Sequence, residues 1–204
     1  MEENNNTDLT KPIQNKAPSE QTETKGSSFW EFVRYAIIAL IIVIPFRIFI
    51  AQPYVVSGSS MDPTFKDADY LIVDQLSKRF EEPQRGAVVI IRYPKDTSKF
   101  FIKRLIGFPG ETVEIKNGSV YIQGVLKESA LNEATLLNEP YVVYGKNENF
   151  SIKLGVDEYF VMGDNRAGSS DSRAWGTLPK KYIIGRPVIR LLPINKIDVW
   201  PGIF

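Results

Sequence analysis

The chain has 204 residues, of which 24% are charged, and its formal net charge is +1. This near balance gives no electrostatic reason to expect a nucleic-acid partner. The chain contains neither cysteine nor histidine, which excludes disulfides, thiol nucleophiles, Ser-His-Asp triads and histidine-ligated zinc sites. Proton transfer near neutral pH would therefore need a carboxylate, a tyrosine or a desolvated lysine.

The first segment, residues 1–28, is rich in Asn, Thr, Gln, Glu and Lys and has few large apolar side chains. Such a composition cannot bury enough surface to offset the entropy that is lost on ordering. We therefore expect this segment to be a disordered tail.

Residues 29–50 are predicted to form a single transmembrane helix. As a helix, residues 30–50 would span roughly 31 Å, close to the ~30 Å hydrocarbon core of a bilayer. The charged residues Glu31, Arg34 and Arg47 lie near the two ends, where long side chains reach the headgroups. A cleaved secretory signal and a buried core helix are the alternatives. The flanking charges favour a cytoplasmic N-terminus, which places the rest of the chain outside the cytoplasm.

Residues 51–204 are predicted to form a mainly β domain. Alternating apolar residues between turn signals favour a twisted, barrel-like antiparallel fold, with a small inserted β subdomain at 109–156. Asn117-Gly118 supplies positive φ at both centres of a two-residue turn, so a hairpin is expected there. The expected strands are 53–56, 70–73, 87–93, 100–108, 112–116, 119–122, 158–162 and 183–192.

The first stretch with candidate chemistry is 57–64, which reads Ser-Gly-Ser-Ser-Met-Asp-Pro-Thr. Small residues followed by proline would hold an exposed hydroxyl on a tight turn, with backbone N–H groups free to act as donors. Taken alone, such a run is most often an ordinary loop.

The second stretch is 100–107, where alternation places Phe101, Lys103 and Leu105 on one face of a strand. Burial of Lys103 would disfavour its charged form and lower its pKa towards roughly 7–8, which suits a general base. A solvated lysine on an edge strand is the ordinary alternative.

The third stretch is 162–173, which gathers carboxylates, arginines and hydroxyls in a loop after an apolar strand. Such a loop suits a hydrogen-bonded polar network, and a solvated loop with surface ion pairs is the alternative. Asp164 and Asp171 are too few acids for a calcium loop of the EF-hand type. No metal and no cofactor are predicted.

Together these stretches resemble the bacterial type I signal peptidases, also called leader peptidases, a serine protease family with a Ser/Lys dyad. The matching segments are Ser-Met-Asp-Pro-Thr at 60–64, Ile-Lys-Arg at 102–104, Gly-Asp-Asn-Arg at 163–166 and Asp-Ser-Arg at 171–173. They stand in the order that the family shows, after a membrane span. The resemblance covers roughly 29–192 and implies that 51–204 is an extracytoplasmic peptidase domain.

The resemblance implies a catalytic role for two residues: Ser60 would attack the scissile carbonyl, and a neutral Lys103 would take its proton. Ser169 matches a serine that hydrogen-bonds and orients the lysine amine. Asp171 and Arg173 match a structural ion pair. Gly163 matches a position that leaves room for the lysine stem, and the Ser60 N–H would be one oxyanion donor.

The sequence departs from the family pattern at several positions. Gly58 stands where some members carry a serine that helps to stabilise the oxyanion, so the second donor is unassigned. Ala167-Gly168 stands in place of the usual Asp-Asn, and Ala87 in place of a common acid. Both residues of the dyad are present.

The implied substrates are exported preproteins whose signal peptides end in an Ala-x-Ala pattern, cleaved at the cell membrane. Shallow apolar pockets accept a methyl group and reject bulk, and an extended substrate segment would pair with an enzyme strand. By correspondence with the family, the expected pocket residues are Tyr54, Val56, Met61, Phe65, Ile90, Phe101 and Ile102. The alternative role for these apolar residues is ordinary core.

Two other functions are compatible with this chemistry. One is a catalytically inactive, membrane-bound adaptor or assembly protein of the same fold, which loss of the serine or the lysine would mark. The other is a self-cleaving Ser/Lys regulator, which a DNA-binding helical domain and an internal Ala-Gly site would mark. The sequence retains Ser60 and Lys103 and has an apolar N-terminal segment in place of such a domain.

Overall fold

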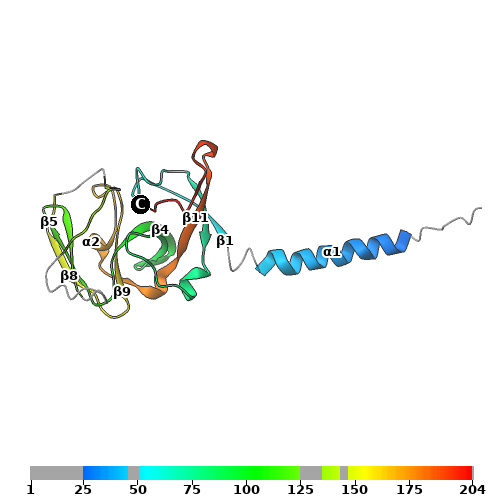
Figure 1. The fold of residues 1–204 in the computed structure, drawn as a ribbon, viewed down its shortest axis with the longest axis horizontal. Helices are drawn as coiled ribbons and strands as arrows, with labels where there is room; N and C mark the ends of the chain where they lie inside the picture. The colour runs from blue at the N-terminus through cyan, green and yellow to red at the C-terminus, as the bar shows by residue number, and fades with distance from the viewer. Residues whose placement is uncertain (1–24, 46–50, 125–134, 143–146, 204) are drawn as a thin grey trace, which may run out of the picture. The chain divides into compact units, whose positions relative to one another are not determined.

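A computed structural model of the chain describes residues 25–45, 51–124, 135–142 and 147–203 (Figure 1). The chain divides into two compact units, Met1–Ile41 and Ile42–Phe204.

Helix α1 runs from Lys25 to Pro45 and supplies all the described residues of the N-terminal unit. It begins inside the expected tail, because residues 25–28 contain no proline and extend a helix that has already nucleated. The other expected tail residues, 1–24, and the end of the expected span, 46–50, lie outside the described residues. Among the helices that the structure describes, none combines the length and the apolar character that crossing a bilayer requires.

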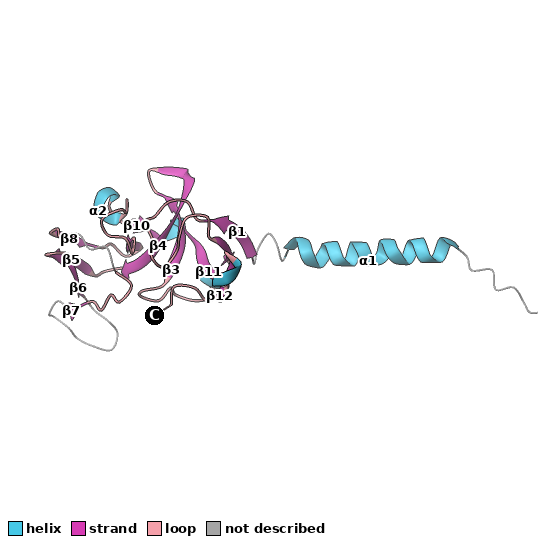
Figure 2. Cartoon of the chain, turned by 90° about the horizontal axis from the view of Figure 1, so that it is seen from above, coloured by secondary structure: helices cyan, strands magenta, loops and turns pink. Residues whose placement is uncertain are grey.

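The second unit is built mainly from antiparallel β-sheet, as predicted. The larger sheet has the strand order β1-β2-β11-β3-β4-β9-β10, and β12 pairs with β11 (Figure 2). The described pairings run along this path from β1 to β10, with β12 added beside β11. The bounds are β1 Ala51–Val55, β2 Tyr70–Asp74, β3 Val88–Tyr93, β4 Asp96–Gly107, β9 Glu158–Met162, β10 Leu178–Pro179, β11 Ile183–Leu192 and β12 Asp198–Val199.

The second sheet has the order β7-β6-β5-β8 and uses only residues between 112 and 153. Asn117 and Gly118 have φ of 50° and 81° and join β5 to β6, with Lys116 paired to Ser119, so the predicted hairpin is confirmed. In both views β5 and β8 lie at the side of the domain remote from β1 and β11. The bounds are β5 Thr112–Lys116, β6 Ser119–Gln123, β7 Thr135–Leu136 and β8 Phe150–Lys153.

The described part of the chain also has short helices between the strands. The α-helix α2 follows β9, and three 3₁₀ turns connect other strands. Their bounds are α2 Ser172–Trp175, η2 Ser77–Arg79, η3 Lys180–Tyr182 and η4 Ile194–Lys196.

Strand β4 lies at the centre of the core, and its residues from Ile102 to Gly107 are all buried. The predicted alternation holds: Phe101 and Leu105 pack in one hydrophobic cluster, Ile102 in a second and Ile106 in a third. A polar side chain on this part of β4 therefore enters a dry interior whichever face it takes. This placement is the reason for the unusual setting of Lys103.

Candidate active site

Ser60 lies on a turn that leaves the edge strand β1. Backbone bonds from Val56 N to Asp69 O and from Ala68 N to Val56 O, both of 2.9 Å, close the base of this turn. Gly58 has a φ of +89°, which glycine adopts without strain. The Gly58 N–H donates to Asp67 Oδ1 at 2.7 Å, so it is already occupied.

Lys103 comes from β4, where it pairs with Val89 of β3. Its side chain is only 3% exposed, and its Nζ donates to Ser60 Oγ at 2.7 Å. Nζ also lies 5.4 Å from the ring centroid of Phe101. The two residues that sequence reasoning selected as nucleophile and base are thus in direct contact.

The pKa of Lys103 is lowered from 10.5 to about 8. Burial is the main cause, because removing the amine from water disfavours its charged form. The nearby carboxylates of Asp171 and Asp164 raise the pKa in opposition, and Arg173 lowers it. A sizeable fraction of the amine is therefore neutral in mildly alkaline solution.

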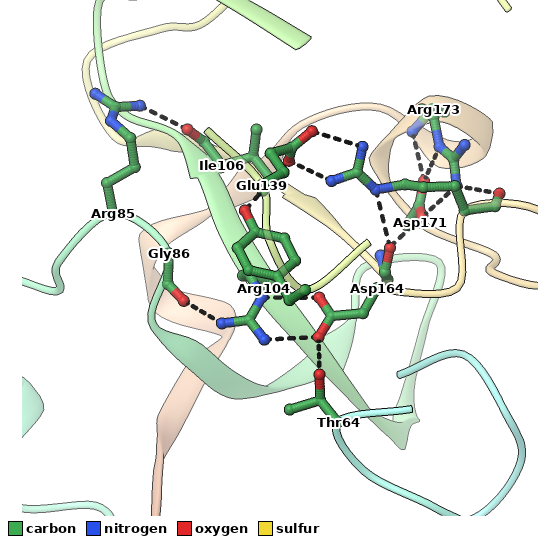
Figure 3. Close-up of polar contacts among 12 residues, drawn as sticks. Thr64, Arg85, Gly86, Arg104, Ile106, Glu139, Asp164, Asp171 and Arg173 are labelled. Atoms are coloured by element: carbon green, nitrogen blue, oxygen red, sulfur yellow. Dashed lines mark hydrogen bonds and ion pairs between the residues drawn. The ribbon is translucent and has the colours of Figure 1, made fainter. Parts of the chain in front are cut away.

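Asp171 and Arg173 form the predicted ion pair at the start of α2. Arg173 donates to the two Asp171 oxygens, each at 2.8 Å, and the Gly163 N–H donates to Asp171 Oδ2 at 3.0 Å (Figure 3). Burial alone would raise the pKa of Asp171, but Arg173, Gly163 and Ser169 together hold it below its ordinary value. The anion near Lys103 is therefore fixed in place and stays charged.

Gly163 and Ser169 lie against the nucleophile turn. A Cβ added at Gly163 would overlap Ser60 O and the Ser169 side chain. The nearest groups to the space that this glycine leaves are thus Ser60 and Ser169, and room for the stem of Lys103 stays a prediction. Ser169 Oγ is buried beside Asp171, but within the described residues it has no hydrogen-bond partner at good geometry, Lys103 included.

A second buried ion pair, between Arg104 and Asp164, was not predicted. Arg104 Nε and Nη2 donate to the Asp164 carboxylate at 2.7 and 2.6 Å, and the side chains are 1% and 0% exposed. The Thr64 hydroxyl donates to Asp164 at 2.6 Å, while Arg104 Nη1 reaches the Gly86 carbonyl at 2.6 Å (Figure 3). The sequence did contain a signal for this pair: Lys103 and Arg104 place a charged residue on each face of an apolar strand. A buried charge requires a partner, so a carboxylate near Arg104 could have been expected.

Asn165 ties the loop after β9 to the nucleophile turn. Its backbone N–H donates to Ser60 O and its side-chain amide to Ser59 O, both at 3.1 Å. The segment was noted in the sequence, but nothing local in it indicated this long-range contact. The turn that carries Ser60 is thus held by hydrogen bonds to the carbonyl oxygens of Ser59 and Ser60.

A cavity of about 90 Å³ adjoins Ser60 and Lys103. Five of the seven expected pocket residues line it: Tyr54, Val56, Ile90, Phe101 and Ile102. The other two, Met61 and Phe65, are 1% and 0% exposed and lie outside this lining, in the core cluster that also contains Val56 and Ile90. Apolar side chains of one type serve both roles, and spacing did not separate them. The lining also includes residues that were not predicted: Val55, Ser57, Leu71 and Phe100.

No cluster of three or more acidic side chains suited to a metal ion is present in the described part of the chain. At Ser60 the structure brings together a hydroxyl and a buried amine. This arrangement suits attack on a carbonyl carbon.

Comparison with known proteins decides the family. Residues 29–192 match the model of the protein family described as "Signal peptidase, peptidase S26". The chain belongs to the signal peptidase family, peptidase S26. Its activity is that of a serine endopeptidase of the signal peptidase I type.

Curated signal peptidases align along most of this chain. A signal peptidase I of Bacillus amyloliquefaciens is 38% identical over 204 residues, covering 93% of this chain and 96% of that protein. A signal peptidase I P of Bacillus subtilis subsp. natto is 40% identical over 190 residues, covering 87% and 96%. A probable signal peptidase I-2 of Synechocystis is 34% identical over 188 residues, covering 89% and 82%.

Proposed function

We propose that this signal peptidase removes N-terminal signal peptides from exported preproteins after Ala-x-Ala-like sequences, with Ser60 as nucleophile and Lys103 as general base. The observation that carries this proposal is the 2.7 Å contact between Lys103 Nζ and Ser60 Oγ at a 3% exposed lysine. A solvated surface lysine would keep an ordinary pKa and remain protonated. The buried amine of Lys103 has a pKa of about 8 and can accept a proton.

The reaction follows from this pair. Neutral Lys103 Nζ takes the proton of Ser60 Oγ as the oxygen attacks the scissile carbonyl carbon. The tetrahedral intermediate collapses, the peptide C–N bond breaks, and the Lys103 ammonium protonates the leaving amine. The signal peptide then remains as an ester on Ser60. Water, deprotonated by Lys103, attacks that ester and restores both side chains.

The Ser60 N–H is proposed as one donor to the oxyanion. Each such donor is worth roughly 3–4 kcal/mol in other hydrolases. The Gly58 N–H is a poor second donor, because Asp67 already accepts its hydrogen bond. The second donor stays unassigned.

Supporting roles are proposed for Ser169, Gly163, Asp171 and Arg173. Asp171 binds the Gly163 N–H, and Gly163 in turn leaves room for Ser60 O and Ser169. A small rotation of the buried Ser169 hydroxyl would let it orient the amine of Lys103 during turnover.

The cavity beside the dyad is proposed to bind the small residues that precede the scissile bond. Its volume of about 90 Å³ and its mainly apolar lining suit methyl side chains, such as those of alanine. A larger side chain would have to displace packed strands, which costs free energy. The preprotein segment is proposed to bind as an extended strand.

Residues 29–50 are proposed to anchor the enzyme in the cell membrane by a single span, with residues 51–204 as a barrel-like peptidase domain on the extracytoplasmic side. Support comes from the apolar run after Trp30 and from the charges at its ends. A preprotein is held in the same bilayer by its own apolar segment, so tethering raises the effective concentration of the two partners.

The test is cleavage of a purified preprotein bearing Ala-x-Ala by the full chain, with products identified by mass spectrometry. Ser60→Ala and Lys103→Ala should each abolish cleavage and leave the circular dichroism spectrum unchanged. Lys99→Ala is the matched control, because Lys99 lies on the same strand with its side chain 63% exposed. Full turnover by either dyad variant would contradict the proposal.

A further inference from the structure

Two partly buried glutamates between β7 and β8 of the second sheet contact the loop after β9. Glu139 accepts two hydrogen bonds from Arg166, one from Nη1 at 2.9 Å and the other from Nη2 (Figure 3). The two side chains are 10% and 3% exposed. Glu148 accepts from Arg173 Nη1, with exposures of 19% and 8%.

Both arginines continue to the groups that surround Ser60. Arg166 Nε donates to Gly163 O at 3.2 Å. Arg173 Nη2 donates to Arg166 O and to Asp171 Oδ2, both at 2.8 Å. Each glutamate is therefore linked through a single arginine to Gly163 or Asp171.

A third contact joins the same segment to the opposite face of β4. The Tyr141 hydroxyl donates to Glu139 at 3.2 Å, and the Tyr141 ring lies 3.9 Å from the Arg104 guanidinium. Arg104 holds Asp164, the residue that follows Gly163. Three contacts thus join residues between β7 and β8 to the loop after β9 and its anchor: Glu139 with Arg166, Glu148 with Arg173, and Tyr141 with Arg104.

These pairs are largely shielded from water, which separates them from ordinary surface ion pairs. A surface pair contributes little because water competes for both charges. Loss of Glu139 would leave the buried Arg166 guanidinium without that carboxylate, and loss of Glu148 would leave Arg173 with Asp171, so the surrounding backbone should rearrange. The backbone that would rearrange here is that of Gly163, which lies against Ser60 O.

We propose that Glu139 and Glu148 are positioning residues for the Ser60–Lys103 pair, which makes the second sheet a brace for the active-site loop. This inference rests on the proposed function. Neither glutamate touches Ser60 or the cavity beside it. Each acts through an arginine, so its loss should slow chemistry more than it weakens substrate binding.

The kinetic test uses Glu139→Gln and Glu148→Gln in the full chain. A misplacement of the nucleophile by a fraction of an ångström should lower kcat by roughly tenfold to a hundredfold, with KM changed less than about twofold. Glu139→Asp and Glu148→Asp keep the charge and should recover part of kcat. The control is Glu114→Gln, which removes the half-exposed Glu114–Lys116 pair of the same sheet and should leave both constants unchanged.

Amide hydrogen exchange of residues 163–173 provides a readout that needs no substrate. The buried Gly163 N–H, bonded to Asp171, should exchange faster in the Gln variants than in the wild type or in Glu114→Gln. If the wild type fails to cleave the preprotein, the proposed function fails while exchange still decides the brace. If the folded Gln variants keep wild-type kcat and wild-type exchange, the brace is overturned. A rise in KM at unchanged kcat also overturns it, because that result assigns the glutamates to substrate binding.

Discussion

At the scale of single residues, the low pKa of Lys103 comes mainly from its burial, and the Arg173 guanidinium lowers it further. The carboxylates of Asp171 and Asp164 oppose this effect. The apolar neighbours of β4 on both faces set the burial. The proton affinity of the base is therefore reduced by the core and partly restored by nearby acids.

The pH dependence of turnover follows from this balance. Only the neutral amine of Lys103 accepts the Ser60 proton, so kcat/KM should rise with pH and level off above a pKa of about 8. Cleavage rates of the full chain between pH 6 and 10.5 would measure this. A rising limb centred near the ordinary lysine pKa of ~10.4 would contradict a desolvated base.

Replacement of the base by a permanent cation is a sharper test. Lys103→Arg should lower kcat by at least roughly a hundredfold to ten-thousandfold, because arginine stays protonated at every usable pH. The measurement is single-turnover cleavage with folded protein, and Lys99→Arg on the exposed part of β4 serves as its control. Activity of Lys103→Arg close to wild type would remove lysine from the mechanism.

Ser169 provides a third test at this scale. Its buried Oγ lies beside Gly163 and Asp171 without a well-formed hydrogen bond. If it orients the amine of Lys103 during turnover, Ser169→Ala should reduce kcat by roughly tenfold and leave KM nearly unchanged. Ser170→Ala is the adjacent, exposed control. An equal loss in substrate binding would place Ser169 in the pocket instead.

At the scale of elements, β4 carries two cations at successive positions and sends them to opposite faces. Lys103 reaches Ser60, and Arg104 reaches Asp164 and Gly86. The alternation of a strand produces this division directly. One element thus provides both the base of the dyad and an anchor of the loop that surrounds it.

The buried Arg104–Asp164 pair should dominate the stability of this region. Asp164→Ala leaves the 1% exposed Arg104 without its carboxylate and should destabilise the fold by roughly 3–5 kcal/mol. Urea unfolding at constant m-value would measure the change. Lys99→Ala breaks the exposed Lys99–Asp96 pair of the same strand and should cost less than about 1 kcal/mol. Equal effects of the two substitutions would argue against a structural role for the buried pair.

At the scale of the whole molecule, long alternating patterns predicted the strands well. The observed bounds of β5, β9 and β11 are the predicted ones, and α1 overlaps the predicted helix. The prediction missed the four-residue strand β8 and the pairs of residues that form β7, β10 and β12. A two-residue strand has no period, and only its partner in space defines it.

The candidate site shows the same division between local and long-range information. The contact of Ser60 with Lys103 and the Asp171–Arg173 pair agree with expectations drawn from short motifs. The partners Glu139 and Glu148 lie 27 and 25 residues from their arginines, in a segment without a motif. Met61 and Phe65 were expected in the pocket from the family resemblance, and they pack in the core cluster that also holds the lining residues Val56 and Ile90.

The three hydrophobic clusters of the described core consist of residues between Tyr54 and Ile184, so residues 51–204 should fold without the preceding segment. A chain lacking residues 1–50 should unfold in urea with the same midpoint as the full chain, but should no longer sediment with phospholipid vesicles. Flotation of both proteins with the same vesicles would measure the difference. Equal vesicle binding by both would contradict the proposed anchor.

The neighbouring positions of Lys103 and Arg104 also bear on how faithfully the domain assembles. If β4 paired with β3 one residue out of register, every side chain of β4 would move to the opposite face of the sheet. The guanidinium would then point at the hydroxyl of Ser60, and the amine would face Asp164. Such a slipped molecule would lack a titratable base and would strand a cation in an apolar interior. Lys103, which the reaction requires, and Arg104, which the fold requires, thus also favour the correct pairing of β3 with β4. A molecule with the slipped pairing would be both unstable and inactive.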